Sequence, residues 1–245
     1  MEITNNEIKA VKALASKKTR DEEGLFVVEG EKMVAEALKS SFSVEKIYRK
    51  EEVGDKAMER MTLLTSPSPV LAVVRKPADL DDASCIMKAG GLYLALDCIR
   101  DPGNMGTILR IADWFGADGV FAAPDSVDVF NPKVVQATMG AIFRVPFHYT
   151  SIPELCSKAV KAGGKVYGTF LDGIDMYSST LDFPKNGPIV IVIGNESNGI
   201  SPETAAVVTD RLYIPPFPAD RQGSESLNAA VATAITVAEF RRQQR

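Results

Sequence analysis

The feature that most constrains the fold of this 245-residue chain is an alternation, from Leu92 onward, of short apolar runs with segments long enough to form helices. The apolar runs have the length of β-strands and cover residues 92–96, 119–122, 165–170, 189–193 and 211–214. Apolar strands that alternate with helices are typical of a mostly parallel sheet covered by helices. The pattern therefore predicts an α/β domain whose ligand site lies in the loops beyond the carboxyl ends of the strands.

The first 75 residues are organised differently and read as helix, strand, helix, strand, helix, strand, with apolar runs at residues 25–28 and 70–74. Residues 76–91 are polar and rich in turn-forming residues, including Pro77 and the pair Gly90-Gly91, as in a linker. We therefore expect a small N-terminal α/β domain over residues 1–80 and a larger domain over residues 90–245.

The composition, with 45% hydrophobic and 24% charged residues, is that of an ordinary globular protein. No apolar stretch approaches the roughly 20 residues of a membrane span. Glu2 and Glu7 fit neither a secretory signal nor an acid-free transit peptide. The three cysteines, Cys85, Cys98 and Cys156, are widely spaced and form no C-x-x-C pair, which argues against disulfides and zinc. We expect a cytoplasmic protein without a metal or a membrane span.

The net charge of −4 gives no hint of a nucleic-acid partner, but its local distribution does. Five basic residues and no acid lie between positions 9 and 20, namely Lys9, Lys12, Lys17, Lys18 and Arg20. They predict a basic face for contact with RNA, and a solvated helix face is an equally good interpretation.

The first informative loop, residues 97–106, follows the apolar run at 92–96 and precedes a helix predicted over 107–116. Asn104 is well suited to cap that helix. Arg110 lies about 9 Å further along the helix axis, but its long side chain leans back toward the helix start. Asn104 and Arg110 can therefore converge on one ligand, and the alternative is a cap plus a surface arginine.

The second loop, residues 194–200, follows the apolar run at 189–193. Its two glycines, Gly194 and Gly199, lie five residues apart and permit a tight turn with backbone amides near a ligand. Ile200 stands where a P-loop needs lysine, and the glycine pattern of a dinucleotide fold is missing. Glu196 must be hydrogen-bonded or functional at the end of an apolar strand.

The third segment begins at Ile214-Pro215, passes through a polar loop with Arg221 and Gly223, and enters a helix of small residues at Ser226. Small residues let this helix pack closely against another backbone, as in a well-packed terminal helix or a dimer contact. Helix capping explains only in part why the polar residues Ser226 and Asn228 stand at the entrance of this helix.

In this order and spacing, the three segments resemble the signature motifs of the SpoU/TrmH family of RNA 2′-O-ribose methyltransferases within the SPOUT superfamily. The motifs are Asn-x-Gly-x-x-x-Arg, Gly-x-Glu-x-x-Gly-[Ile/Leu], and Ile-Pro followed by Ser-Leu-Asn. Each is weak alone, and jointly they are specific. The resemblance covers residues 92–240, and residues 24–30 resemble the family's N-terminal substrate-binding domain. The loop before Ser226 is longer than the family's common form, and by the same comparison Asn195 falls at a filler position of the second motif.

The resemblance implies S-adenosyl-L-methionine as cofactor, a trefoil knot in the C-terminal domain and a homodimer that acts on RNA. It places catalytic and RNA-contacting roles on Asn104, Arg110, Glu196, Ser226 and Asn228. It places backbone contacts to the adenosine of the cofactor on Gly194, Ile214 and Leu227. No metal is required, because the sulfonium is already an electrophile.

The family's usual proposal makes Arg110 the base, but a guanidinium with a pKa above about 12 is a poor proton acceptor. We expect Arg110 to anchor a phosphate and to polarise the 2′-hydroxyl, and Glu196 to hold the loops. Asn104, Ser226 and Asn228 would order the hydroxyl. His148, which lies in none of the motifs, is interpreted as structural.

Ribosomal RNA is the preferred substrate, because an N-terminal domain of this type is more typical of the ribosomal enzymes in the family, and transfer RNA is the alternative. A non-catalytic RNA-binding or assembly factor is a second hypothesis, and retention of all five polar positions argues against it. A small-molecule oxidoreductase lacks its glycine fingerprint.

Overall fold

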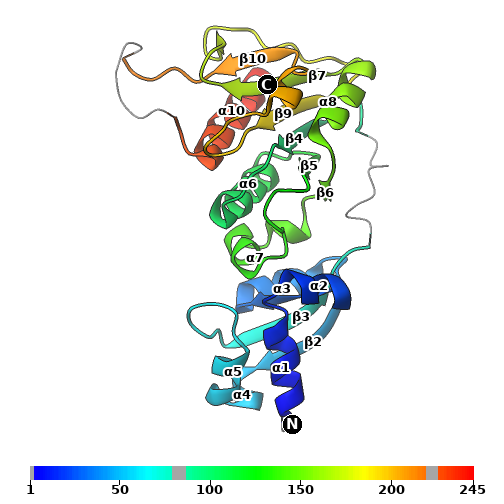
Figure 1. Cartoon of the computed structure of the whole chain (residues 1–245), viewed down its shortest axis with the longest axis vertical. Helices are drawn as coiled ribbons and strands as arrows, with labels where there is room; N and C mark the ends of the chain where they lie inside the picture. The colour runs from blue at the N-terminus through cyan, green and yellow to red at the C-terminus, as the bar shows by residue number, and fades with distance from the viewer. Residues whose placement is uncertain (1–2, 79–86, 219–225) are drawn as a thin grey trace. The chain divides into compact units, whose positions relative to one another are not determined.

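The computed structural model describes residues 3–78, 87–218 and 226–245 (Figure 1). The chain divides into two compact units. Unit 1 comprises residues 1–78 and 128–144, and unit 2 comprises residues 79–127 and 145–245. The segment 128–144 therefore belongs to unit 1, although the sequence analysis assigned it to the larger C-terminal domain. Part of the predicted linker, residues 79–86, lies outside the described residues.

Unit 1 is built on a three-stranded antiparallel sheet. Its central strand, β3 (Val70–Arg75), lies between β1 (Leu25–Glu29) and β2 (Val44–Arg49), with Val73 opposite Val27 and Ala72 opposite Ile47. The helices are α1 (Asn5–Ala13), α2 (Lys17–Glu23), α3 (Glu31–Lys39), α4 (Lys50–Val53) and α5 (Asp55–Met61). The predicted order of helices and strands is confirmed, with two short helices at the first and third helical positions.

The segment 128–144 adds α7 (Pro132–Thr138) and the 3-10 helix η1 (Ala141–Phe143) to unit 1. Helix α7 packs against β1. The ring of Phe130 lies 4.6 Å from that of Phe26, centroid to centroid, and Phe143 stacks on Phe26 as well. Aromatic side chains of this segment thus complete the core over β1.

Arg20 is buried in unit 1, with 2% of its side chain exposed. Its Nε and Nη2 donate to the Asp128 carboxylate at 3.0 and 2.6 Å, and its Nη1 donates to the carbonyl oxygens of Leu14 and Ala15. The prediction that Arg20 belongs to an RNA-contacting basic face is wrong, because its guanidinium is fully engaged inside the unit.

Unit 2 contains a seven-stranded sheet in the order β6-β5-β4-β9-β7-β10-β8, and every neighbouring pair is parallel. The strands are β4 (Leu92–Leu96), β5 (Gly119–Ala122), β6 (Phe147–Tyr149), β7 (Lys165–Phe170), β8 (Ile174–Asp175), β9 (Ile189–Ile193) and β10 (Asp210–Tyr213). The predicted parallel sheet is confirmed. Strand β10 lies one residue earlier than predicted, and β6 and β8 were missed because they are only three and two residues long.

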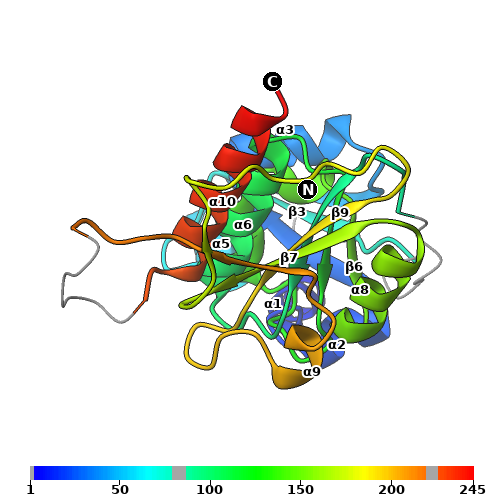
Figure 2. The same cartoon turned by 90° about the horizontal axis from the view of Figure 1, so that it is seen from above.

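The helices of unit 2 are α6 (Pro102–Trp114), α8 (Ile152–Lys161), α9 (Pro202–Ala205) and α10 (Ala229–Gln243). Helices α6 and α10 pack side by side on one face of the sheet, and α8 covers the other (Figure 2). All residues of β4 and β9 are buried, since both faces of the sheet are covered. Within the described ranges, no helix is long and apolar enough to cross a membrane.

Candidate active site

Three polar side chains, one from each sequence motif, form a single chain of hydrogen bonds. The Asn104 Nδ2 donates to the Glu196 Oε1 at 2.9 Å, and the Asn228 Nδ2 donates to the Asn104 Oδ1 at 2.8 Å. Asn104 lies in α6, Glu196 in the loop after β9, and Asn228 at the start of α10. The segments that lie up to 124 residues apart in the sequence therefore meet at the carboxyl end of the sheet, as predicted for an α/β fold.

The Glu196 carboxylate lies among N–H donors. Besides Asn104, it accepts hydrogen bonds from the backbone N–H groups of Arg100 and Asp101 at 3.4 and 3.2 Å, and from the Asn195 side chain at 3.4 Å. Burial alone would raise the pKa of this carboxyl group, but the hydrogen bonds outweigh burial, so that the pKa lies below its ordinary value of 4.5. Glu196 is therefore ionised at neutral pH and is a weak base.

Asn104 does not cap α6, which corrects the sequence prediction. The helix begins at Pro102, and its N-cap is Asp101, whose carboxylate accepts from the Asn104 backbone N–H at 2.7 Å. Proline is favoured at the first helical position, because its φ is already helical and the N–H that it lacks would have no partner there. Helix α6 therefore starts at Pro102, five residues before the predicted residue 107. The Asn104 side chain is thereby free to bond Glu196 instead of the helix end.

Asn228 has both of the roles considered for it. Its Oδ1 accepts from the backbone N–H groups of Ala230 and Val231 at 3.0 and 3.2 Å, which caps α10. Its Nδ2 donates to Asn104. One amide group thus fixes the start of α10 and joins it to α6.

Arg110, Ser226 and Leu227 lie outside this hydrogen-bonded chain and are exposed. Within the part of the chain that the structure describes, Arg110 makes no hydrogen bond or ion pair, so that its guanidinium is available to a ligand. Arg221 and Gly223 of the longer loop lie outside the described residues.

Asn195 organises the second motif, which the interpretation as a filler position missed. Its Oδ1 accepts from the N–H groups of Ser197 and Asn198, both at 3.0 Å, and its Nδ2 donates to the Cys98 carbonyl oxygen at 2.7 Å. Its backbone pairs with Gly199 in both directions. An asparagine between a glycine and a glutamate in a turn-rich loop was the available signal, since Asn commonly bonds backbone groups a few residues away.

Gly194 is required by close packing of the same loop. A Cβ atom at this position would lie 2.3 Å from the Gly199 carbonyl carbon and 2.4 Å from the Ile200 nitrogen. Only glycine leaves room for the 195–199 turn to fold back on the end of β9. Ile214, half-buried, lies directly after β10.

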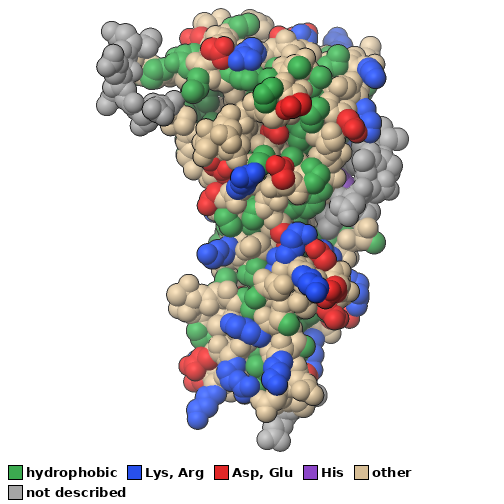
Figure 3. Space-filling view, in the orientation of Figure 1, with side chains coloured by type: hydrophobic (Ala, Val, Ile, Leu, Met, Phe, Trp, Pro, Cys, Tyr) green, Lys and Arg blue, Asp and Glu red, His purple; other side chains and the backbone are tan. Residues whose placement is uncertain are grey.

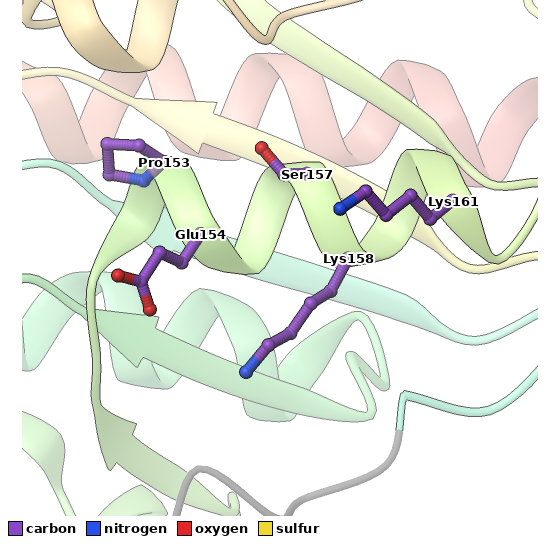
Figure 4. A pocket seen from close by; sticks show the side chains of 5 residues that line it. All are labelled: Pro153, Glu154, Ser157, Lys158 and Lys161. Carbon is purple, nitrogen blue, oxygen red and sulfur yellow. The ribbon is translucent and has the colours of Figure 1, made fainter.

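The surface of unit 2 also has a hollow along α8, lined by Pro153, Glu154, Ser157, Lys158 and Lys161 (Figure 4). None of the three motifs contributes a residue to it. Cys98 and Cys156 are free thiols, and Cys85 lies outside the described residues. Among the residues that are described, no group of three or more His, Cys, Asp or Glu side chains could hold a metal ion.

Comparison with known proteins shows which family has this architecture. The model of the SpoU rRNA Methylase family matches residues 91–238, and the model of the MRM3-like substrate binding domain matches residues 5–77. The 23S rRNA (guanosine(2553)-2′-O)-methyltransferase RlmP of Bacillus subtilis (strain 168) is 30% identical, over 97% of this chain and 96% of its own.

Solved structures agree. A TrmH-family protein from Porphyromonas gingivalis is 38% identical with a TM-score of 0.85, and the match covers 98% of this chain and 99% of the other. An AdoMet-bound rRNA methyltransferase from Sinorhizobium meliloti is 31% identical with a TM-score of 0.87, over 100% and 98% of the two chains. The fold is therefore that of the SpoU/TrmH methyltransferases. The chain belongs to the SpoU rRNA Methylase family.

Proposed function

We propose that this protein transfers the methyl group of S-adenosyl-L-methionine to a ribose 2′-hydroxyl of ribosomal RNA. The observation that carries the proposal is the hydrogen-bonded chain of Glu196, Asn104 and Asn228, which assembles the three motifs of the family at one end of the sheet. The names of the relatives, which include a 23S rRNA 2′-O-methyltransferase similar over nearly the whole chain, support ribosomal RNA rather than transfer RNA.

The carboxyl end of the sheet fits an adenosine. Leu171 after β7, Phe217 after β10 and Leu227 before α10 are 69%, 90% and 49% exposed, so that their apolar side chains are available to pack on an adenosine. Gly194 directly after β9 and Ile214 directly after β10 offer backbone groups at the same end of the sheet. Gly194, Ile214 and Leu227 would hold the adenosine, and the cofactor, when bound, supplies a methyl group activated by a sulfonium.

The amide groups of Asn104 and Asn228 are suited to donate hydrogen bonds to the reacting hydroxyl. Each Nδ2 carries two N–H groups, and each uses one within the chain of hydrogen bonds. The Glu196 carboxylate accepts one N–H of the Asn104 amide and so fixes the orientation of that amide, and the Asn104 Oδ1 in turn orients Asn228 by accepting from its Nδ2. Preorganised donors of this kind align the ribose oxygen for in-line displacement and stabilise the negative charge that it carries as its proton leaves, before it attacks the methyl carbon.

Arg110 is assigned to the RNA, where its exposed guanidinium binds a phosphate and polarises the 2′-hydroxyl. Ser226, exposed at the entrance of α10, orders the same ribose. Glu196 acts as a positioning residue, since its lowered pKa makes it a poor proton acceptor.

Unit 1 is assigned to RNA binding. Its match to a substrate-binding domain model supports this role, and Lys and Arg side chains gather on the face of unit 1 seen in Figure 3. Lys9, Lys12, Lys17 and Lys18 are exposed, and two of them form ion pairs along α2, Lys17 with Asp21 and Lys18 with Glu22.

Homodimer formation, a trefoil knot and a cytoplasmic location are further parts of the proposal. The family relationship supports the knot and the dimer. Trp114 at the end of α6 and Val231 in α10 are 85% and 48% exposed, and a second copy would cover such apolar side chains. The cytoplasmic location rests on the composition and the cysteine pattern.

The test is transfer of labelled methyl from S-adenosyl-L-methionine to total RNA from a strain that lacks the gene, followed by mapping of alkali-resistant linkages. We expect wild-type protein to label one ribose of ribosomal RNA, and Arg110→Ala to lower the rate by about 100-fold. Lys185→Ala, which removes an exposed charge near the amino end of β9, is the matched control.

If only transfer RNA were labelled, transfer RNA would replace ribosomal RNA as the proposed substrate. Binding of the cofactor without transfer to any RNA would support the non-catalytic assembly factor. Near-normal turnover by Arg110→Lys would contradict a specific role for the guanidinium fork.

A further inference from the structure

The loop between β4 and α6 has a strained and well-supported backbone. Cys98 has a φ of +63°, and within the described ranges only one other non-glycine residue, Met139, has a positive φ. The Cys98 carbonyl oxygen accepts from the Asn195 side chain at 2.7 Å, and the Ile99 carbonyl oxygen accepts from the Val127 N–H at 2.8 Å. The loops after β9 and β5 thus hold this left-handed turn from both sides, and strain retained in this way commonly marks a functional position.

The consequence of the turn is the placement of Arg100. Its backbone N–H faces the Glu196 carboxylate, while its side chain is exposed. The backbone of Arg100 is therefore held next to Glu196, and its side chain is exposed beside the active-site loops.

The charges at this end of the sheet require a cation if RNA is to approach. Six acidic residues occupy the described loops that follow the carboxyl ends of β4, β5, β7 and β9, namely Asp97, Asp101, Asp125, Asp128, Asp172 and Glu196. Asp128 forms an ion pair with Arg20 and Asp172 with Arg211, and the other four carboxylates are without an ion pair among the residues described. In those same loops, and in residues 214–218 after β10, Arg100 is the one Lys or Arg among the residues described. A polyanion is repelled by such a surface unless a cation neutralises the nearest phosphate.

The N-terminus of α6 does not supply the positive charge that a phosphate needs. Helix N-termini bind phosphates through their free N–H groups. Here the carboxylates of Asp101 and Glu196 already accept from the N–H groups of Asn104, Arg100 and Asp101. The positive end of the helix is therefore largely neutralised by the protein itself, and Arg100, two residues before the helix, supplies the positive charge there.

We propose that Arg100 binds a phosphate of the RNA strand next to the target ribose and so positions the strand for methyl transfer. This inference rests on the proposed function. Arg100 lies two residues before α6 and Arg110 lies within it, so that the two arginines flank Asn104 in the chain and are assigned to different phosphates. A phosphate contact is independent of base sequence and contributes to the salt dependence of binding.

The experiment measures initial rates of methyl transfer against the concentration of total RNA from a strain that lacks the gene, at several salt concentrations. We expect Arg100→Ala to raise the KM for RNA about tenfold and to lower the slope of log affinity against log salt by about one. The kcat and the affinity for S-adenosyl-L-methionine, measured by calorimetry, should stay within about twofold of wild type. Arg100→Lys should recover part of the loss, and Lys185→Ala should match wild type.

Three results would overturn the inference: an unchanged KM and salt slope in Arg100→Ala, a fall in kcat with KM unchanged, or an equal loss of cofactor affinity. The last two would mean that the residue acts in the chemistry or in folding. If wild-type protein methylates no RNA, the proposed function fails on its own. The inference is then decided by filter binding of the same RNA, where equal retention by wild type and Arg100→Ala would refute it and weaker retention by Arg100→Ala would support it.

Discussion

At the residue scale, the site depends on which hydrogen-bonding groups each polar residue has already used. Asn104 donates to Glu196 and accepts from Asn228, so its orientation is determined by both neighbours. Asn195, although outside the predicted catalytic set, fixes its own loop and the turn at Cys98. The function of each amide is therefore set by its partners rather than by its residue type.

Asn104→Asp tests this arrangement. The substitution preserves the size of the side chain but removes the N–H donor and places a second carboxylate against that of Glu196. We expect kcat to fall by about 100-fold, as for loss of a preorganised donor, and the pKa of Glu196 to rise because of like-charge repulsion. Methyl-transfer kinetics and carboxyl titration by NMR measure the two effects.

Asn186→Asp, an exposed asparagine before β9, makes the same chemical change away from the site and should leave kcat as in wild type. A fully active Asn104→Asp enzyme would show that the amide donor is dispensable.

At the scale of elements, Glu196 connects the loop after β9 to the start of α6, and the connection depends on its charge. The pKa of Glu196 is lowered in the folded protein, so the stability that it contributes is fully present above its ordinary value of 4.5 and is lost as the pH falls through the folded value. The loop that leads into α6 then loses the acceptor for the N–H groups of Arg100 and Asp101, the two residues before the helix.

The prediction concerns the difference in free energy of unfolding between wild type and Glu196→Gln. We expect wild type to be the more stable protein, by a constant amount near neutral pH, and the difference to shrink as the pH falls below 4.5. Denaturant unfolding across this pH range measures it. Glu203→Gln, at an exposed glutamate of α9, controls for loss of one negative charge. A difference that grows at acidic pH would contradict the assigned direction of the pKa shift.

At the scale of the whole molecule, the two units are not consecutive pieces of chain. The chain passes between them at 78/79, 127/128 and 144/145. Unit 1 takes Asp128, the partner of buried Arg20, and Phe130, which packs on Phe26, from a segment within the sequence of the methylase domain. Unit 1 is therefore incomplete without residues from the other side of the sequence boundary.

We expect a fragment of residues 1–78 to unfold at a lower temperature than unit 1 in the full chain, or not to fold. Loss of the partner of a buried charge costs about 3–5 kcal/mol, and the exposed ring of Phe26 adds to this. Arg20→Met should stabilise the fragment and destabilise the full chain. Thermal unfolding followed by circular dichroism provides the comparison. A fragment as stable as unit 1 in the intact protein would refute the role given to residues 128–144.

The sequence by itself determined the parallel sheet and the three motifs. Strands such as β4 and β9 are buried on both faces and therefore read as continuous apolar runs, which is a local signal. The glycines of the 194–199 loop and the polar residues after the strands were recognisable for the same reason, because the requirement for them lies within a few neighbouring residues.

Only the tertiary structure decided the partners of the side chains. Contacts between segments distant in sequence bury Arg20, supply the N–H donors around Glu196, assign residues 128–144 to unit 1 and place Arg100 next to Glu196. The secondary-structure propensity of a segment contains no information about such contacts. The energy of a buried ion pair or of a hydrogen bond between two segments exists only when both segments are folded together. The short strands β6 and β8 belong here too, because pairing with a neighbour, rather than their own two or three residues, makes them strands.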